Sequence, residues 1–500
     1  MFVTGADADV VVVGAGPVGL VLAAELALAG AAVLVLERRT EPDESMKAAS
    51  INVPTAEALA RRGLLPAARQ VQREVRERAG APVLGGARFT GHFAGVVLEP
   101  DLVDWTRPEL AAHAAAADTW LVPQRELEGL LADHLARLGV PVRREVEVTE
   151  LDDAGEDVLL GTTAGPFRGR WVVGCDGGRS AVRRLAGIDF PGTDPELTGY
   201  LAVADIAEPE LLGEGWTWSE RGAYRCGPQP GRLITAEFDG GPADRTAPVE
   251  LADVQAGLRR ISGTEVTLTA LRGPATRWTD NARQAATYRS GRVLVAGDAA
   301  HVHPPFGGQG LNLGVGDAMN LGWRLGAVVA GWAPDGLLDG YDAERRPLGA
   351  RVLDWTRAQT GMLRGDPKSA ALREIVTALL RTPDGATWAV ERSSGVAQHV
   401  ELPGEHPLLG RFAPDLPLAD GTRLVDHGHD GGFLLLDRTP GREFARAAER
   451  WPGRVRAVPD GPGAPAGALV RPDGIVVWAA DDAGAPGLPE ALHRWAGDPE

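Results

Sequence analysis

The sequence is poor in cysteine and in positive charge. Cys175 and Cys226 are the only cysteines among 500 residues, which excludes a disulfide scaffold, a CxxC redox pair and a cysteine zinc site. Lys and Arg number 51 against 68 Asp and Glu, giving a net charge of −17. A chain this acidic is poorly suited to bind nucleic acid or an anionic membrane. We therefore expect neither among its partners.

The sequence also lacks an unbroken hydrophobic run of membrane-spanning length. Between Asp9 and Glu37 the only charged residue is Glu25, but several glycines and a proline divide the segment. Asp7 precedes it and no basic residue lies near the start, which argues against a signal peptide. We expect a soluble, cytoplasmic protein in which this segment folds as a buried strand–helix–strand unit.

Strands and helices alternate along the first part of the chain. The β-branched run Val10–Val13 predicts a strand that is buried on both faces. The Ala- and Leu-rich segment Val18–Ala29 predicts a helix, and Ala32–Leu36 a second buried strand. This alternation is typical of a parallel, doubly wound sheet. Further strands and helices are predicted at residues 125–138, 171–174, 292–296 and 315–380.

Two later regions follow different patterns. From about Gly199 to Leu271, short alternating segments separated by Gly and Pro predict an antiparallel sheet in a second layer. After about residue 400, a Pro-containing linker at 402–407 leads to predicted strands at 432–436 and 474–478. We therefore predict a small C-terminal domain, which has no cysteine and so no dithiol chemistry.

The first motif, Gly14–Gly19 (GAGPVG), lies between the first predicted strand and helix. Its first glycine permits a tight turn, Gly16 permits close approach of a pyrophosphate, and its third permits helix–strand packing. The helix N-terminus then presents free N–H groups to the phosphates. Glu37 ends the second strand, where its carboxylate can accept from ribose hydroxyls; it favours FAD or NAD over a 2′-phosphate, although Arg38 follows it. The alternative is a glycine-rich turn without a ligand.

Two more glycine motifs follow predicted strands. Asp176 and Gly177 come just after the strand at 171–174, where the alternative is a simple turn. Asp298 ends another strand and precedes a glycine-rich loop that runs to Asn312. An acid at a strand end can hold a ribityl or ribose hydroxyl, and such a loop can turn backbone N–H groups towards an anionic flavin oxygen. The alternative for the loop is a role in packing.

The three motifs, in this order, resemble those of the group A flavoprotein aromatic hydroxylases, the family that includes para-hydroxybenzoate hydroxylase. Within it, the chain is most similar to actinobacterial aromatic polyketide oxygenases with an added C-terminal domain. The resemblance implies an α/β fold (α+β overall) and a monomer or homodimer. Its domains would be a Rossmann-like FAD-binding domain at 1–195 and 272–395, an inserted β-sheet substrate domain at 80–120 and 196–271, and a thioredoxin-like domain at 400–500.

The resemblance also implies the residues of a flavin site. Pro305 and Gly307 would lie near substrate and flavin, and no residue is assigned a catalytic role. Relatives often have an arginine where this chain has Lys47, which keeps the charge but loses the planar fork, and a second arginine of the family pattern is absent. The implied FAD contacts are Gly14, Gly16, Pro17, Gly19, Glu37, Arg38, Lys47, Gln124 with Arg125 as its alternative, Asp176, Asp298, Gly310, Leu311 and Asn312.

The family chemistry belongs to the cofactor. NAD(P)H reduces FAD, O₂ adds at flavin C4a, and the hydroperoxide transfers one oxygen atom to a substrate, here expected to be a polycyclic aromatic of antibiotic biosynthesis. No metal-ligand cluster is predicted, because His301 and His303 lie inside the third motif and are interpreted as structural. Hydroxylation is preferred; Baeyer–Villiger oxygenation, inactivation of an aromatic antibiotic and a non-catalytic flavin protein are the alternatives. Candidate substrate-wall residues are Trp216, Trp218, Tyr224 and Phe238, together with His92 and Phe93.

Overall fold

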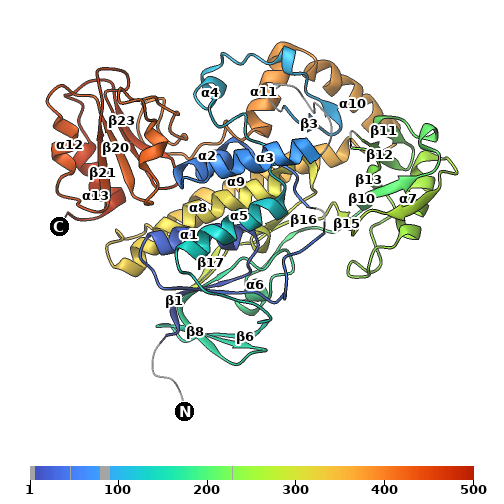
Figure 1. The fold of residues 1–500 in the computed structure, drawn as a ribbon, viewed down its shortest axis with the longest axis horizontal. Coiled ribbons are helices and arrows are strands. Elements are labelled where there is room, and N and C mark those ends of the chain that lie inside the picture. Colours follow the sequence, from blue (N-terminus) through green and yellow to red (C-terminus); the bar gives the residue numbers. More distant parts are fainter. Residues whose placement is uncertain (1–5, 46, 79–89, 228, 500) are drawn as a thin grey trace.

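A computed structural model describes residues 6–45, 47–78, 90–227 and 229–499. In this part of the chain the three predicted regions fold as three packed bodies (Figure 1). A parallel sheet with its helices occupies the centre, an antiparallel sheet lies at one end, and the C-terminal domain lies at the other. The fold class predicted from the sequence is confirmed.

The central sheet begins with the buried segments that the sequence predicts. Its described strands run in the order β17-β18-β8-β1-β2-β5, with β6 and β7 paired beside β8. Strand β1 pairs in parallel with β2 and β8, and β18 with β8, so the carboxyl ends of these four strands lie along one edge. The bounds are β1 (Ala8–Val13), β2 (Val33–Leu36), β5 (Val142–Arg143), β6 (Val148–Asp153), β7 (Val158–Thr162), β8 (Phe167–Gly174), β17 (Arg289–Ser290) and β18 (Val293–Val295).

Two buried helices, α1 (Pro17–Leu28) and α8 (Gln309–Ala330), pack against each other beside this sheet. The two helices approach closely at Gly322, which has no side chain. A Cβ at this position would lie 2.3 Å from the Glu25 side chain, so only glycine fits there. The other helices of this body are α2 (Val53–Arg61), α3 (Leu65–Arg78), α4 (Pro108–Ala111), α5 (Gln124–Arg137), α6 (Ala181–Leu185), α9 (Gly340–Gly361), α10 (Pro367–Leu380) and α11 (Pro383–Ser393).

The helical stretch predicted from 315 to 380 is present, with a corrected start. It begins six residues earlier, at Gln309, and it divides into the three helices α8, α9 and α10. Gly331 ends α8 in the left-handed conformation at φ 77°, and Asp366 caps α10 by accepting from two backbone N–H groups. None of the helices in the described ranges is long and apolar enough to cross a membrane.

The second sheet confirms the antiparallel pattern predicted after Gly199 and extends it to Thr279. Its order is β11-β12-β13-β10-β14, with β15 also paired to β10. One face packs on helix α7 (Leu251–Ser262), which was not predicted although Glu250 and Asp253 form a capping box at its start. The strands are β10 (Thr198–Ile206), β11 (Gly215–Ser219), β12 (Gly222–Cys226), β13 (Arg232–Glu237), β14 (Leu268–Leu271) and β15 (Thr276–Thr279).

Short pairings join the two sheets. The hairpin of β3 (His92–Phe93) and β4 (Val96–Val97) lies against β11. The contact is close at Gly95, where a Cβ would lie 2.8–2.9 Å from the Trp216 and Trp218 rings. Residues 80–89, the start of the predicted 80–120 segment, lie outside the described residues. A three-stranded sheet of β9 (Gly192–Thr193), β16 (Ala282–Gln284) and β19 (His301–Val302) completes the connection.

The C-terminal body is a mixed four-stranded sheet of order β21-β20-β22-β23. It docks on α8, where Trp323 packs with Phe433 at a 5.4 Å centroid separation. Arg471 of this body makes two hydrogen bonds of 2.8 and 2.9 Å to Glu344 of α9. The elements are β20 (Phe433–Asp437), α12 (Glu443–Ala448), β21 (Val455–Pro459), β22 (Gly467–Val470), β23 (Val476–Ala480) and α13 (Leu488–Ala496).

Candidate flavin and substrate site

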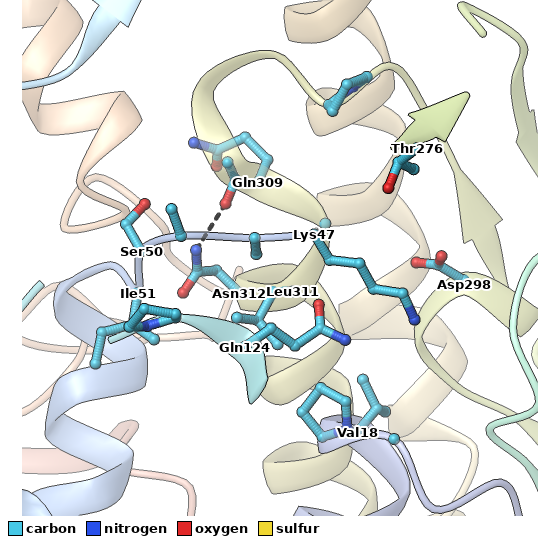
Figure 2. Close-up of a pocket in the computed structure, with 18 of the residues that line it drawn as sticks. Val18, Lys47, Ser50, Ile51, Gln124, Thr276, Asp298, Gln309, Leu311 and Asn312 are labelled. Atoms are coloured by element: carbon cyan, nitrogen blue, oxygen red, sulfur yellow. Dashed lines mark hydrogen bonds between the residues drawn. The ribbon is translucent and has the colours of Figure 1, made fainter. Parts of the chain in front are cut away.

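A cavity of about 1760 Å³ lies between the carboxyl edge of the central sheet and one face of the second sheet. Figure 2 shows Lys47, Gln124 and Asp298 pointing into it, with Thr276 on the side of the second sheet. The structure brings together twelve of the fourteen residues predicted to bind cofactor; Gly19 and Arg125 do not line the cavity. Those that do are Gly14, Gly16, Pro17, Glu37, Arg38, Lys47, Gln124, Asp176, Asp298, Gly310, Leu311 and Asn312.

The three glycines of the first motif differ in their surroundings. Gly14 has φ 110°, and a Cβ there would lie 2.4 Å from the Cys175 carbonyl oxygen. A Cβ at Gly19 would lie 1.9 Å from the Gly14 carbonyl oxygen, so Gly19 lets α1 pack on the turn and does not face the cavity. Around Gly16 no atom of the described residues lies within 4 Å of such a Cβ. Open space therefore adjoins the backbone at the start of α1, where unpaired helix N–H groups attract an anion.

Glu37 ties the second strand to this glycine turn. Its Oε2 accepts a hydrogen bond from the Ala15 N–H at 2.8 Å, and its Oε1 accepts from the Arg39 N–H at 2.9 Å. The carboxylate is thus held in place at the cavity wall by backbone donors. Each carboxylate oxygen can accept more than one hydrogen bond, so the residue can still accept from a ribose hydroxyl as predicted.

Among the described residues, one carboxylate oxygen of Asp176 accepts hydrogen bonds and the other has no partner. Its Oδ2 accepts from the Ala181 and Val182 N–H groups at 2.7 and 3.2 Å, which caps α6. Its Oδ1 is buried and has no hydrogen-bond partner in the described residues. Buried polar atoms are nearly always hydrogen-bonded. The unused oxygen, in a residue that lines the cavity, therefore indicates a ligand donor that the protein alone does not supply.

The N-terminus of α8 faces the same cavity. Gly308 precedes the helix in the left-handed conformation at φ 62°, and no side chain caps the helix. Asn312 is occupied by the protein: its Oδ1 accepts from the Asn52 N–H and the Thr55 hydroxyl at 2.8 Å, and its Nδ2 donates to the Gly308 carbonyl at 2.7 Å (Figure 2). Free backbone N–H groups in this first turn, with a partial positive charge, are what remains for a ligand.

Lys47 is held at the cavity by Asp43. Its Nζ lies 2.9 Å from the Asp43 carboxylate, which also pairs with Arg39 at 2.7 Å. Burial alone would raise the pKa of Asp43, but these two cations and the Ser45 hydrogen bonds outweigh it and hold the pKa well below its usual value. Asp43 therefore keeps its negative charge and holds the Lys47 ammonium at the cavity through this ion pair.

Gln124, and not its alternative Arg125, faces the cavity. The Arg125 side chain is 66% exposed and lies 3.4 Å from Glu44 at the surface. Gln124 donates from Nε2 to Glu128 at 2.8 Å. Burial raises the pKa of Glu128, a rise that the Gln124 hydrogen bond partly opposes. Because both predicted candidates are adjacent on one helix turn, roughly 100° apart around the axis, only one of them can face a given cavity.

Of the four aromatic residues predicted to form the substrate wall on the second sheet, Trp216 lines the cavity and the other three do not. Trp218 and Phe238 instead pack in the apolar contact with Phe306 and Leu363, beyond the cavity. Tyr224 lies on the opposite face of the sheet, where its hydroxyl accepts from the Gly213 N–H at 3.2 Å. Successive residues of a strand alternate between faces, and the sequence does not show which set faces the cavity.

The two other wall candidates divide in the same way. His92 lines the cavity, and its ring lies 5.8 Å from that of Trp216. Phe93 does not; it is buried in the central core and packs edge-on against Trp355 at 4.7 Å. Burial, and then the positive charge of Arg225, lower the pKa of His92 to about 4, so its imidazole is neutral near pH 7.

His301 and His303 have neighbours that account for them structurally. Nε2 of His301 lies 2.6 Å from Asp317, whose other oxygen accepts from Arg345 at 2.8 Å, and all three side chains are buried. Nδ1 of His303 lies 2.9 Å from the Pro304 carbonyl oxygen. Across the described ranges, no cluster of His, Cys, Asp and Glu is arranged to hold a metal ion.

Comparison with known proteins decides the family. The FAD binding domain family matches residues 7–356, and the aromatic-ring hydroxylase C-terminal family matches residues 406–499. The chain belongs to the FAD-dependent aromatic-ring hydroxylases. It is a flavin-dependent monooxygenase, with FAD as cofactor and NAD(P)H as the reductant typical of the family.

Relatives of the hydroxylase match it over nearly its whole length. The 12-dehydrotetracycline 5-monooxygenase/anhydrotetracycline 6-monooxygenase of Streptomyces rimosus is 41% identical, over 98% of this chain and 99% of that protein. The rifampicin monooxygenase of Streptomyces venezuelae is 39% identical, over 95% and 96%. The solved structure of the anhydrotetracycline hydroxylase OxyS from Streptomyces rimosus superposes with a TM-score of 0.86 at 40% identity, covering 99% and 100% of the two chains.

The cavity of the hydroxylase fits the FAD that its family binds. The open space at Gly16 suits the negatively charged pyrophosphate of FAD. The uncapped start of α8 suits the negative charge of the flavin ring. The unused Oδ1 of Asp176 and the exposed carboxylate of Asp298 suit hydroxyl donors of its sugar and ribityl parts.

Sequence reasoning missed the polar residues on the sheet side of this cavity. Arg225, Gln229, Arg232 and Thr276 all line it. The alternation within 222–226 and 232–237 was a usable signal, because it places Arg225 on the face opposite Tyr224. It could not say that this face was the interior one.

Proposed function

We propose that the enzyme hydroxylates a polycyclic aromatic substrate held between FAD and the second sheet. The supporting observation is the size of the cavity and its two unlike walls. Pockets for one drug-sized ligand measure about 300–1000 Å³, whereas this one measures about 1760 Å³. One wall carries the predicted FAD contacts, and the other carries Trp216, Trp278 and Ile234 from the second sheet.

The chain's own residues would bind, orient and exclude water. When bound, reduced FAD would activate O₂ so that one of its atoms enters the substrate and the other leaves as water. The free N–H groups at the start of α8 would stabilise negative charge on a flavin ring bound in the cavity. Phe306, which packs edge-on to Trp278 at 5.3 Å, closes the apolar contact beside the cavity and keeps water from the reacting atoms. Pro305 and Gly307 flank Phe306 and would lie between substrate and flavin.

The test is product mass spectrometry under ¹⁸O₂. Purified FAD-loaded protein and NADPH are incubated with polycyclic quinones and phenols, beginning with anhydrotetracycline and rifampicin, which are named in two relatives. We expect one ¹⁸O atom in a product whose carbon rings are intact. A ring-expanded ester or lactone with one ¹⁸O would instead identify Baeyer–Villiger oxygenation.

Two controls make the result decisive. Protein stripped of FAD measures oxidation that does not need the cofactor, and reactions in H₂¹⁸O measure exchange with water. Stable FAD binding with no label in any product, and no substrate-dependent NADPH oxidation, would leave the non-catalytic flavin protein as the better hypothesis. Purification of a colourless protein that cannot be reconstituted with FAD would overturn the placement of the cofactor.

A further inference from the structure

Two arginines that line the cavity, Arg225 and Arg232, have no counter-charge among the residues that the structure describes. Within the described residues, Arg225 and Arg232 make no side-chain hydrogen bond or ion pair, and Nε of Arg232 is buried without a partner. Other arginines of the second sheet and its helix are paired: Arg260 with Glu237 at 2.7 Å, and Arg272 with Asp205. The two unpaired residues are therefore exceptional within this layer.

Strand register places both arginines on the wall that faces the cavity. Arg225 of β12 lies directly opposite Trp216 of β11 and Ile234 of β13. The same row continues through Leu201 of β10, and all four residues line the cavity. Arg232 precedes Ile234 by two residues and so projects from the same face, diagonal to Arg225.

The surroundings leave the pair short of negative charge. Burial lowers the pKa of both arginines, and for Arg232 the next cause is repulsion from Arg225. Arginine nevertheless stays protonated near neutral pH. His92, beside Trp216, is neutral and adds no charge. Two half-buried guanidinium groups that repel each other and lack a carboxylate are unfavourable in the free protein unless a ligand compensates them. Uncompensated charge of this kind in a cleft is a mark of a binding site.

We propose that Arg225 and Arg232 bind an oxyanion of the substrate, an ionised phenol or enol on the polycyclic ring system. This inference rests on the proposed function and adds the charge state in which the substrate is held. Guanidinium groups donate several hydrogen bonds in a plane, which suits a phenolate oxygen and a neighbouring carbonyl together. The phenolic proton is released to solvent on binding. An ionised oxygen donates electron density into its ring, which favours attack by an electrophilic oxygen at the ring carbons ortho and para to it.

The test compares two probes of the same shape on the FAD-loaded protein. 2-Hydroxyanthraquinone ionises to a coloured phenolate, whereas 2-methoxyanthraquinone cannot ionise. We expect the hydroxy compound to bind more tightly by about tenfold or more, the usual effect of one charge-assisted hydrogen bond. Difference spectra should show its phenolate form, and the pKa of the bound phenol should lie at least about one unit below that in buffer, which is the same tenfold effect.

Variants then assign this preference to the pair. Arg225→Gln and Arg232→Gln should each remove most of the preference and return the bound phenol towards its ordinary pKa. Arg225→Lys and Arg232→Lys should retain part of both effects because they retain the charge. Arg272→Gln is the matched control, since Arg272 lies in the same sheet but is exposed and paired with Asp205. Anthraquinone-2-carboxylate, measured beside its amide, tests whether the pair prefers a carboxylate to a phenolate.

The results separate this inference from the proposed function. Equal binding of the hydroxy and methoxy probes to the wild-type protein, with no shift in the phenol pKa, would overturn it without recourse to any variant. A preference that survives both glutamine variants, or one found for the carboxylate alone, would also overturn it. Phenolate binding that depends on the pair, without oxygen transfer to any substrate, would leave the anion site in place and refute the proposed hydroxylation.

Discussion

Replacing Gly16 by alanine should separate cofactor binding from folding. The residue has φ −74° and ψ 177°, which alanine adopts without strain, and in the described part of the chain no atom lies within 4 Å of the added Cβ. The apoprotein should therefore be unchanged or more stable by about 0.4–1 kcal/mol. The methyl group would occupy the space proposed for the pyrophosphate and weaken one or two charge-assisted hydrogen bonds, each worth about 1.5–3 kcal/mol. We expect the dissociation constant for FAD to rise on the order of tenfold to a hundredfold.

Two other glycine-to-alanine variants are the controls. In Gly19→Ala the Cβ would lie 1.9 Å from the Gly14 carbonyl oxygen, so the apoprotein itself should lose about 1–3 kcal/mol or more of stability. In Gly129→Ala, within α5, the Cβ meets open space outside the cavity, so FAD binding should be unaffected. Urea unfolding of the apoproteins and titration of flavin fluorescence give both quantities. A wild-type dissociation constant for Gly16→Ala would show that the pyrophosphate lies elsewhere.

Three further predictions follow from particular contacts. Asp298→Ala should weaken FAD binding by about 1–3 kcal/mol, the loss of one charged hydrogen bond; an unchanged flavin titration would remove Asp298 from the site. Burial opposes protonation of His113, but Glu57 at 2.5 Å outweighs it and raises the His113 pKa. The difference in unfolding free energy between wild type and His113→Gln should therefore be full below about pH 6.5 and shrink as pH rises through the folded pKa. A difference in urea unfolding that stays constant with pH would refute the ion pair. A protein truncated after Leu402 should keep its flavin, but it should expose Trp323 and so have lower solubility or a changed oligomeric state. Absorbance measures the flavin, and light scattering measures the mass. If the truncated protein has native mass and stability and has lost only oxygen transfer, the C-terminal domain belongs to the active site.

The sequence predicts which residues line the proposed cofactor side of the cavity because their determinants are local in sequence. A buried strand, a glycine turn and a helix occupy consecutive residues, and chain connectivity alone places Gly14 and Gly16 at the start of α1. Asp298 likewise lies in the short turn that comes soon after β18 ends at Val295. Parallel pairing then sets the ends of β1, β8 and β18 along one edge, so motifs far apart in sequence meet at one cavity.

Positions that depend on rotation about a helix, or on where a helix breaks, were less predictable. Gln124 and Arg125 are adjacent, and tertiary packing alone decides that the first faces the cavity while the second pairs with Glu44. The break after α8 depends on Gly331, whose left-handed conformation is one of several that glycine allows.

The substrate side depends on long-range strand pairing, and there local pattern and function diverge. Alternation along β12 correctly predicts that Tyr224 and Arg225 face opposite ways, and composition alone would place the aromatic residue at an aromatic substrate and the arginine in solvent. The register of the sheet reverses this assignment, because α7 covers the Tyr224 face and the cavity lies on the other. Arg225 faces the cavity, and within the described residues no carboxylate lies near it. The chain has more acidic than basic residues overall, so this unpaired charge is not explained by a lack of acidic residues. An interior charge that the protein does not neutralise is best explained by the charge of what it binds.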